Sequence, residues 1–271
     1  HPYHEAGVYY IQEPSAMAPV SYLMEDYDVV QKEAADCQER ILDLCAAPGG
    51  KSTQIAARMH EMYTSGKWKE QGLLICNEIH PARAKILSEN VERMGIANAM
   101  VTNESPQRLA EVFEDYFTRI LVDAPCSGEG MFRKNEAACE EWNPENVSLC
   151  AERQDGILDC AASMLAPGGR IVYSTCTFAP AENEGSMMRF LLRHPEFRIV
   201  EVKKADGMSA GVPEWAYFRE KMGQVLPEIA QTIRLWPQHL NGEGHYLAVL
   251  EKEGTLRQGY CRNGEEKGIP A

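Results

Sequence analysis

The fold is decided by residues 41–54, which read ILDLCAAPGGKSTQ. The first four residues predict a buried parallel strand, and the glycines that follow predict a tight turn into a helix over residues 52–59. Gly49 and Gly50 let a ligand approach the backbone, and either can adopt a positive φ. The helix start adds unpaired N–H groups and a partial positive charge. This stretch therefore predicts a cradle for a nucleotide-like ligand at the carboxyl edge of an α/β sheet.

The two familiar glycine motifs do not fit this turn. A phosphate-binding P-loop requires glycine where Cys45 stands, and the dinucleotide pattern G-x-G-x-x-G is absent. A cofactor that has a nucleoside but no phosphate fits the stretch better, and S-adenosylmethionine is the candidate. A plain strand-to-helix turn is the alternative, because Pro-Gly-Gly turns are common.

The composition is that of a globular α/β protein with 44% hydrophobic and 25% charged residues. Its 271 residues begin with His1, so we expect a trimmed or incomplete form of a longer chain. No apolar run approaches the roughly 18 residues of a membrane helix, and no secretory signal is visible. The nine cysteines contain no C-x-x-C pair, and most lie in apolar segments. These features predict a cytoplasmic protein with free thiols, no metal and no membrane partner.

Elsewhere, apolar runs and turn residues predict further strands and helices. The expected strands are 7–13, 41–44, 72–78, 99–102, 119–123, 170–174, 233–236 and 245–250. The expected helices are 14–22, 52–59, 81–94, 143–165 and 180–193. Residues 25–39 read as a helix end and a loop, and residues 203–229 as an inserted loop or a substrate-facing lobe. The last two strands predict an antiparallel hairpin that completes a mostly parallel sheet.

The first strand expected after the glycine stretch, residues 72–78, ends in an acid. Glu78 lies 28 residues beyond Gly50, at the strand tip where ribose hydroxyls are held in nucleotide-binding sheets. A solvent-facing glutamate is the alternative for this position.

Two cysteines follow the carboxyl ends of neighbouring strands. Cys126 and Cys176 are 50 residues apart, and one predicted helix separates their strands. Such a strand-helix-strand unit is parallel, so both thiols are expected at the sheet edge that carries the cradle. Asp123 lies at the strand tip between the cradle and the thiols. Buried cysteines are common, so either thiol alone would be weak evidence for catalysis.

This set of side chains suits methylation of a pyrimidine at carbon 5. Addition of a thiolate to carbon 6 makes carbon 5 nucleophilic enough to attack a methyl sulfonium. Asp123 is placed to stabilise the adduct near N3 and the exocyclic amine, and the second thiol to help its release. The attacking thiol needs a lowered pKa, for which Lys51 or a helix N-terminus is the candidate.

Several motifs resemble those of one known family, the RNA cytosine-5 methyltransferases of the Sun and nucleolar-protein type. The matching stretches are 43–54, 123–130, 174–177 and 182–184, while 234–237 and 242–246 are similar to its small-subunit ribosomal RNA branch. The resemblance covers about residues 7–250. It implies a doubly wound, seven-stranded, Rossmann-like class I methyltransferase sheet. We assign residues 1–250 to this catalytic domain, with 1–39 as its lead-in, and 251–271 to a polar tail.

The resemblance also implies roles for individual residues. Cys176 would be the nucleophile and Cys126 would assist release of the product, with Asp123 and Lys51 completing the catalytic set. Where the family usually has an acid near the adenine this chain has Ser105, and Glu104 beside it is an alternative. The residues that would hold S-adenosylmethionine are Cys45, Ala46, Ala47, Pro48, Gly49, Gly50, Lys51, Glu78, Arg83, Ser105 and Asp123.

The expected function is methylation of carbon 5 of a cytosine in RNA, with small-subunit ribosomal RNA as the expected partner. The rivals are a DNA cytosine-5 methyltransferase and a non-catalytic RNA-binding ribosome-assembly factor. A net charge of −13 argues against a general nucleic-acid binder and requires a local basic patch or another domain. The candidates for contacts with the RNA backbone, which can equally be scattered surface charges, are Arg133, Lys134, Arg153, Lys203 and Lys204.

Overall fold

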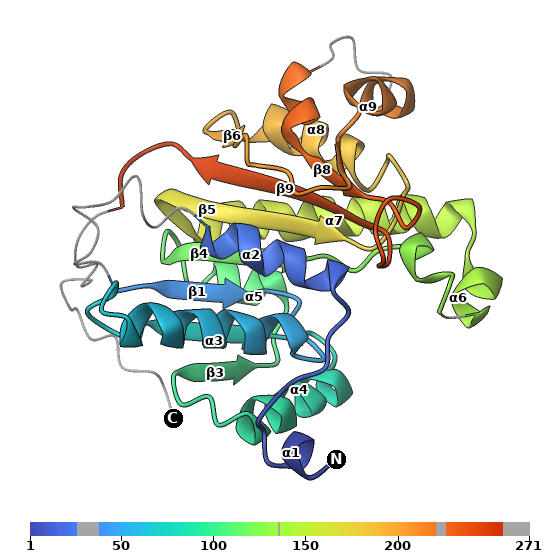
Figure 1. Cartoon of the computed structure of the whole chain (residues 1–271). Coiled ribbons are helices and arrows are strands. Elements are labelled where there is room, and N and C mark those ends of the chain that lie inside the picture. Colours follow the sequence, from blue (N-terminus) through green and yellow to red (C-terminus); the bar gives the residue numbers. More distant parts are fainter. Residues whose placement is uncertain (26–37, 135, 221–225, 257–271) are drawn as a thin grey trace.

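A single twisted sheet organises the chain (Figure 1). The computed structural model describes residues 1–25, 38–134, 136–220 and 226–256. In these residues the sheet has nine strands, in the order β3-β2-β1-β4-β5-β9-β8-β7, with β6 paired to β9. The first five strands run parallel to one another, and β9 is antiparallel to β5. The bounds are β1 Arg40–Asp43, β2 Leu73–Asn77, β3 Ala99–Thr102, β4 Phe117–Asp123, β5 Leu165–Thr175, β6 Phe197–Ile199, β7 Met208–Ala210, β8 Ile233–Leu235 and β9 His245–Lys252.

Helices cover both faces of the sheet, as the doubly wound prediction requires (Figure 1). One face carries α2 (Ala18–Met24), α3 (Gly50–Thr64) and α4 (Pro81–Arg93). The other carries α5 (Pro106–Ala110), α7 (Pro144–Met164), α8 (Glu184–Arg193) and α9 (Pro213–Glu220). None of the helices in the described part of the chain is long and apolar enough to span a membrane.

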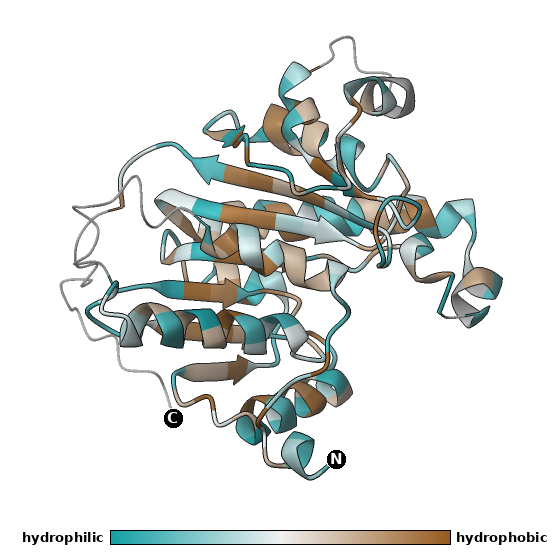
Figure 2. Ribbon diagram, viewed as in Figure 1, coloured by the Kyte–Doolittle hydropathy of each residue, from teal (hydrophilic) through white to brown (hydrophobic). Residues whose placement is uncertain are grey.

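Alternating side chains of each central strand enter two different cores. In β1, Ile41 packs into the core under α3, whereas Leu42 packs into the core under α7. Ile120 and Leu121 of β4 divide in the same way. A strand buried on both faces needs a continuous apolar run, and Figure 2 shows hydrophobic residues along these strands. These apolar runs are why the central strands could be predicted from the sequence.

Local signals fix where several helices begin. The Asn143 side chain accepts a hydrogen bond from the backbone N–H of Asn146 (2.7 Å), and Pro144 occupies the first turn of α7. Helix α3 begins one residue after Gly49, whose φ of 112° lies in the left-handed region that favours glycine. The predicted helices over 52–59, 81–94 and 143–165 are confirmed, and α3 is longer than expected.

The expected strand over residues 7–13 is wrong. These residues form neither helix nor strand, and a short helix α1 (Pro2–Glu5) precedes them. Val8 and Ile11 are exposed, because no neighbouring strand pairs with this segment among the described residues. The helix expected from residue 14 is a short 3₁₀ helix, η1 (Ser15–Met17), followed by α2.

The sheet also has two more strands than the expected seven. The additional strands, β6 and β7, have three residues each, which is too short for a periodic pattern to show. Strand β5 begins at Leu165, five residues before the predicted start, and α8 begins at Glu184 after a turn over 180–183. The remaining short helices are η3 (Glu129–Met131), α6 (Glu136–Glu141) and η4 (Pro227–Gln231).

Two expectations lie wholly or partly outside the described residues. Residues 26–37, in the predicted helix end and loop, and residues 257–271 of the predicted polar tail are not described. The start of that tail is not frayed, since β9 continues to Lys252.

Candidate active site

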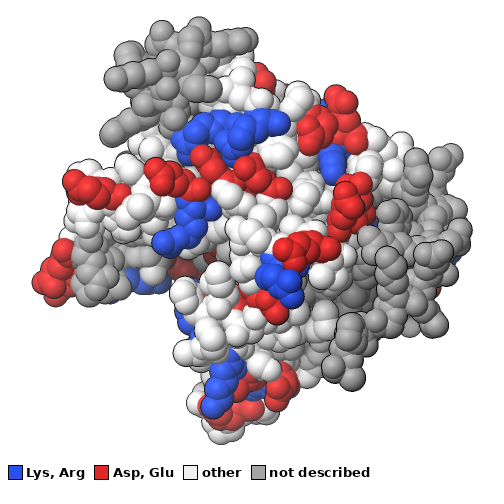
Figure 3. Space-filling view, turned by 180° about the vertical axis from the view of Figure 1, so that it is seen from behind, with Lys and Arg blue, Asp and Glu red and all other residues white. Residues whose placement is uncertain are grey.

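The predicted site residues gather at the carboxyl edge of the parallel strands. Adjacent β1 and β4 lie where the strand order reverses, with β2 and β3 on one side and β5 on the other. In doubly wound sheets ligands bind at such a switch point, outside the carboxyl ends of the strands. Figure 3 shows the surface hollowed on the side to which these ends point, with acidic and basic atoms visible inside the hollow.

The glycine turn after β1 is held by backbone hydrogen bonds. The N–H of Leu44 donates to the carbonyl of Leu121 (3.0 Å), and that of Ala46 donates to the carbonyl of Asn77 (2.8 Å). Gly49 has the positive φ expected for one of the two glycines. A Cβ at Gly50 would lie 3.1 Å from the ring of Tyr10, so a side chain there would press on the N-terminal segment.

Asp43 closes β1 with a carboxyl group that is completely buried. The Ser52 hydroxyl donates to its Oδ2 atom (2.7 Å), whereas Oδ1 has no hydrogen-bond partner among the described residues. Burial raises the pKa of Asp43 to about 7, although the bond from Ser52 favours the charged form. The turn is therefore anchored by a carboxyl group that changes charge near neutral pH.

Glu78 follows β2 and turns its carboxylate toward the glycine turn. Its Oε1 atom accepts a hydrogen bond from the backbone N–H of His80 (2.9 Å), and its Oε2 lies 3.4 Å from a guanidinium nitrogen of Arg83. The same guanidinium donates to the carbonyl of Ala47 (2.8 Å). Arg83 thus links the strand-tip acid to the cradle. The Glu78 carboxylate can accept hydrogen bonds from ribose hydroxyls, and the glycine turn beside it leads into a helix N-terminus. Together these groups suit a nucleoside.

Ser105 has a structural role in addition to any contact with a ligand. Its hydroxyl accepts a hydrogen bond from the backbone N–H of Arg108 (3.3 Å) and caps α5. Glu104 is exposed, and its backbone is bound by the side chain of Asn77. The predicted contact of Ser105 or Glu104 with an adenine stays a prediction.

The two thiols are in contact. The Sγ atoms of Cys126 and Cys176 lie 3.3 Å apart, and the backbone N–H of Cys176 donates to Sγ of Cys126 at the same distance. The hydrogen bond with Cys176 and burial both raise the pKa of Cys126 well above its ordinary value. The predicted proximity of the two cysteines is therefore confirmed.

An ion pair lies between the thiols and the cradle. Lys51 Nζ lies 2.7 Å from Asp123 Oδ2, and the Ser174 hydroxyl donates to Asp123 Oδ1 (2.7 Å). Burial, the largest single influence, would lower the pKa of Lys51, but the charge and hydrogen bond of Asp123 together with the charge of Asp43 raise it. Burial likewise opposes ionisation of Asp123, yet Lys51 and Ser174 lower its pKa. Both groups are held in their charged forms beside Cys176.

The sequence did not single out His245 or Ser174 as members of this site. Strand β9 pairs Tyr246 with Thr175, so His245 begins β9 at the end of β5 that carries Cys176. Its Nδ1 atom lies 3.0 Å from the Ser15 hydroxyl, and burial lowers its pKa. Pairing of distant strands creates this relationship. The signals in the sequence were the predicted terminal hairpin and the resemblance of stretches 174–177 and 242–246 to family motifs.

The backbone of the two cysteine loops also interlocks. Gly130 donates its N–H to the carbonyl of Cys176 (2.8 Å), and a Cβ at Gly130 would lie 2.3 Å from the carbonyl oxygen of Gly244. The Glu129 carboxylate accepts a hydrogen bond from the N–H of Phe178 (3.0 Å). Gly130 is therefore required by close packing against Cys176 and Gly244.

The five basic candidates do not share one location. Lys134 forms an ion pair with Glu243 (2.5 Å), and Arg133 bonds the carbonyl of Gly242 (3.4 Å), so both lie at the β8–β9 loop. Lys204 instead bonds Gln231 of η4 (3.2 Å). On the face shown in Figure 3, basic and acidic residues are interspersed. The predicted RNA contacts of Arg133, Lys134, Arg153, Lys203 and Lys204 stay predictions.

Comparison with known proteins agrees with this geometry. A model of the 16S rRNA methyltransferase RsmB/F family matches residues 32–251. The chain belongs to this family. It is 32% identical over 98% of its length to ribosomal RNA small subunit methyltransferase F of Shewanella denitrificans, and 35% identical over 93% to that of Cronobacter sakazakii. It covers 48% and 46% of those two proteins, so it spans about half the length of the curated relatives it matches.

A solved structure described as a methyltransferase homolog protein from Pyrococcus horikoshii has the same fold. Its TM-score is 0.72 and its identity 25%, over 93% of this chain and 70% of that one. The doubly wound, Rossmann-like methyltransferase fold is thereby confirmed. S-adenosylmethionine is the cofactor of this family domain. Among the described residues, no group of three or more His, Cys, Asp and Glu side chains is arranged to hold a metal ion.

Proposed function

We propose that this chain methylates carbon 5 of a cytosine in small-subunit ribosomal RNA, through a covalent adduct between Cys176 and carbon 6. The observation that carries the proposal is the 3.3 Å contact between the Cys126 and Cys176 sulfur atoms, beside the Lys51–Asp123 pair. The relatives named ribosomal RNA small subunit methyltransferase F support the choice of RNA. We assign residues 1–250 to the catalytic domain.

The nucleophile in this proposal is Cys176. Hydrogen bonding and burial raise the pKa of Cys126, so Cys126 stays protonated and its S–H is free to donate to a Cys176 thiolate. Lys51 is close enough for its positive charge to interact with that thiolate. These contacts support Cys176 as the attacking sulfur and Cys126 as the thiol that donates a hydrogen bond to it.

The remaining residues serve addition and release. Sulfur–carbon bond formation at carbon 6 moves an electron pair to carbon 5, and Asp123 is placed to accept hydrogen bonds from the base. S-adenosylmethionine, held by the glycine turn, Glu78 and Arg83, supplies the methyl group that carbon 5 takes up. Water then takes the proton from carbon 5, the electron pair left behind restores the double bond between carbons 5 and 6, and the carbon–sulfur bond breaks with its electron pair returning to Cys176. Cys126 assists this release by donating its S–H to the departing sulfur. The target base has to be unpaired or flipped out of a helix for Cys176 to reach it.

Transfer of radiolabel from the cofactor to 16S rRNA or to small subunits tests the proposal. Cys176→Ser is expected to abolish incorporation, and Cys126→Ala to leave a slowly migrating covalent RNA–protein band on a denaturing gel. A variant Cys176→Ser that stays fully active while Cys126→Ser is inactive would instead indicate DNA-type chemistry. No label in any RNA would favour a non-catalytic assembly role.

A further inference from the structure

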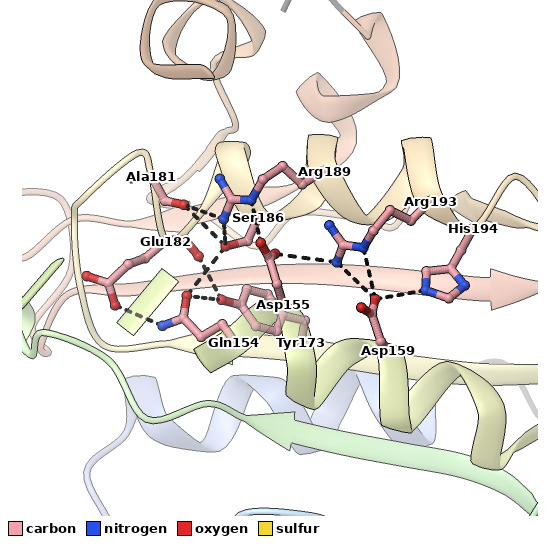
Figure 4. Close-up of polar contacts among 10 residues, drawn as sticks. All are labelled: Gln154, Asp155, Asp159, Tyr173, Ala181, Glu182, Ser186, Arg189, Arg193 and His194. Atoms are coloured by element: carbon pink, nitrogen blue, oxygen red, sulfur yellow. Dashed lines mark hydrogen bonds and ion pairs between the residues drawn. The ribbon is translucent and has the colours of Figure 1, made fainter. Parts of the chain in front are cut away.

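We infer that Gln154 and Glu182 are positioning residues that hold the Cys126 thiol against Cys176 for the release step. The inference rests on the proposed function, because release matters only if a covalent adduct forms. Both side chains are buried, and they come from α7 and from the turn before α8. Figure 4 shows them facing one another between these helices.

The two side chains bind the residues on either side of Cys126. Gln154 Nε2 donates to the carbonyl of Pro125 (2.9 Å). The Glu182 carboxylate accepts hydrogen bonds from the N–H of Ser127 (3.0 Å) and from its hydroxyl (2.5 Å). A fourth bond, from Gln154 Nε2 to Glu182 Oε2 (2.8 Å), joins the pair. The backbone is thus fixed immediately before and after the cysteine.

The glutamine is itself held in one orientation. The Tyr173 hydroxyl lies 3.0 Å from Gln154 Oε1 and 2.7 Å from the backbone carbonyl of Glu182. Since Tyr173 belongs to β5, the Gln154–Glu182 pair is connected to the strand that leads to Cys176 (Figure 4). The carbonyl of Pro125 can only accept a hydrogen bond, so the end of the Gln154 amide that faces the Cys126 loop must be its nitrogen, and the oxygen faces Tyr173.

Ser127 connects the Gln154–Glu182 pair to the loop that carries Cys176. Its hydroxyl lies 2.9 Å from that of Thr177, the residue that follows Cys176. Ser127 is therefore in contact with Glu182 and with the other cysteine loop at once. The distance between the two sulfur atoms depends on this connection as well as on the strands.

Glu182 is a buried carboxyl group that depends on hydrogen bonds, which distinguishes it from a residue that only fills space. Its side chain is fully buried, and its hydrogen-bond donors among the described residues, Ser127 and Gln154, are uncharged. Burial raises its pKa, whereas the bonds from Ser127 and Gln154 oppose that rise. A buried carboxyl group without a cation costs stability unless its hydrogen bonds are satisfied, so the loop residues and the carboxylate depend on each other.

The same helix interface contains further ion pairs. Arg189 contacts Asp155 (2.7 Å), and Arg193 and His194 contact Asp159 (2.9 and 2.8 Å; Figure 4). Arg189 also donates to the carbonyl of Ala181 (3.1 Å) and to the hydroxyl of Ser186 (3.1 Å), and that hydroxyl lies 3.4 Å from Gln154 Oε1, so Asp155 is connected to the Gln154–Glu182 pair. Asp159 instead contacts Arg193 and His194 at the far end of α8, so Asp159→Asn is the matched control for general weakening of the α7–α8 interface.

The test compares Gln154→Met and Glu182→Gln with this control in the full chain. Loosening of Cys126 slows release more than addition, so both variants are expected to accumulate about tenfold more RNA–protein adduct than wild type and to turn over about tenfold more slowly. Asp159→Asn is expected to behave as wild type in both assays. Combining Gln154→Met with Cys126→Ala is expected to add no further adduct, because the thiol being positioned is gone.

Three results separate the possibilities. The positioning role is overturned if Cys126→Ala accumulates adduct while Gln154→Met and Glu182→Gln accumulate no more adduct than the control variant. No adduct from Cys126→Ala or any other variant would overturn the proposed function instead. If thermal unfolding shows that both variants fail to fold, Ser127→Ala decides: excess adduct supports the role, and wild-type release kinetics overturn it.

Discussion

The Nζ atom of Lys51 lies 2.7 Å from Oδ2 of Asp123, which joins the first turn of α3 to the tip of β4. Each partner keeps the other charged in a largely buried place next to Cys176. The cofactor cradle and the thiols are therefore electrostatically connected through this pair.

Replacement of Lys51 by Met is predicted to slow formation of the covalent adduct by about 100-fold, since it removes the cation beside Cys176 and leaves Asp123 unpaired. Asp123→Asn keeps the lysine and is expected to cost less. Single-turnover adduct formation measures both effects. The control is Lys85→Met on α4, an exposed site, and equal rates for the two lysine variants would contradict the assigned role.

Asp43 predicts a dependence of stability on pH. Its pKa is raised from 3.8 to about 7, so the folded state holds a proton that the unfolded state has lost. The contribution is fully present below the unfolded pKa and is lost as pH rises through 7; its full size is on the order of 4 kcal/mol. Urea unfolding of Asp43→Asn relative to wild type should therefore show a growing stability difference between pH 4 and 7.5. A difference that does not change with pH would rule out this titration.

The Arg234–Glu184 ion pair is buried on both sides and is predicted to stabilise the edge of the sheet only as a pair. Arg234 Nε lies 2.7 Å from Glu184 Oε1, and rings of Trp215 and Trp236 lie within 5.2 Å or less of its guanidinium carbon. Arg234→Met leaves a buried carboxylate and is expected to lower the free energy of unfolding by about 3–5 kcal/mol. The double variant with Glu184→Met should lose less. Additive losses in denaturant titrations would contradict this coupling.

Substitution by alanine is expected to have opposite effects at two glycines, Gly130 and Gly156. At Gly130 a Cβ would lie 2.3 Å from the Gly244 carbonyl oxygen and 2.8 Å from that of Cys176, so Gly130→Ala must shift a cysteine loop and is expected to reduce methyl transfer about 100-fold. At Gly156 in α7 nothing lies within 4 Å, and alanine should stabilise the fold by about 0.5–1 kcal/mol. Thermal unfolding and methyl-transfer rates measured side by side check both outcomes.

The central part of the fold was readable because local and long-range signals agree there. Strand β1, the glycine turn and α3 form one continuous pattern, and Asn143-Pro144 marks the start of α7. The contact between Cys126 and Cys176 followed from the rule that strand-helix-strand units are parallel. In these places the sequence neighbourhood of a residue determines its position.

What could not be predicted depends on partners far away in the sequence. Residues 8–11 have strand-forming side chains but no strand to pair with, so propensity alone misled the prediction. The bonds from Gln154 and Glu182 to the Cys126 loop span 29 and 55 residues and obey no periodicity. His245 likewise reaches the site only because β9 pairs with β5.

The position of β9 has a consequence for synthesis of the protein. β9, the last strand among the described residues, lies inside the sheet, between β5 and β8. During translation, β5 therefore remains an open edge until residues 245–252 have left the ribosome, although it is complete some seventy residues earlier. A nascent chain shorter than this presents unpaired backbone groups beside the two thiols, so the active site is assembled only when the final strand arrives.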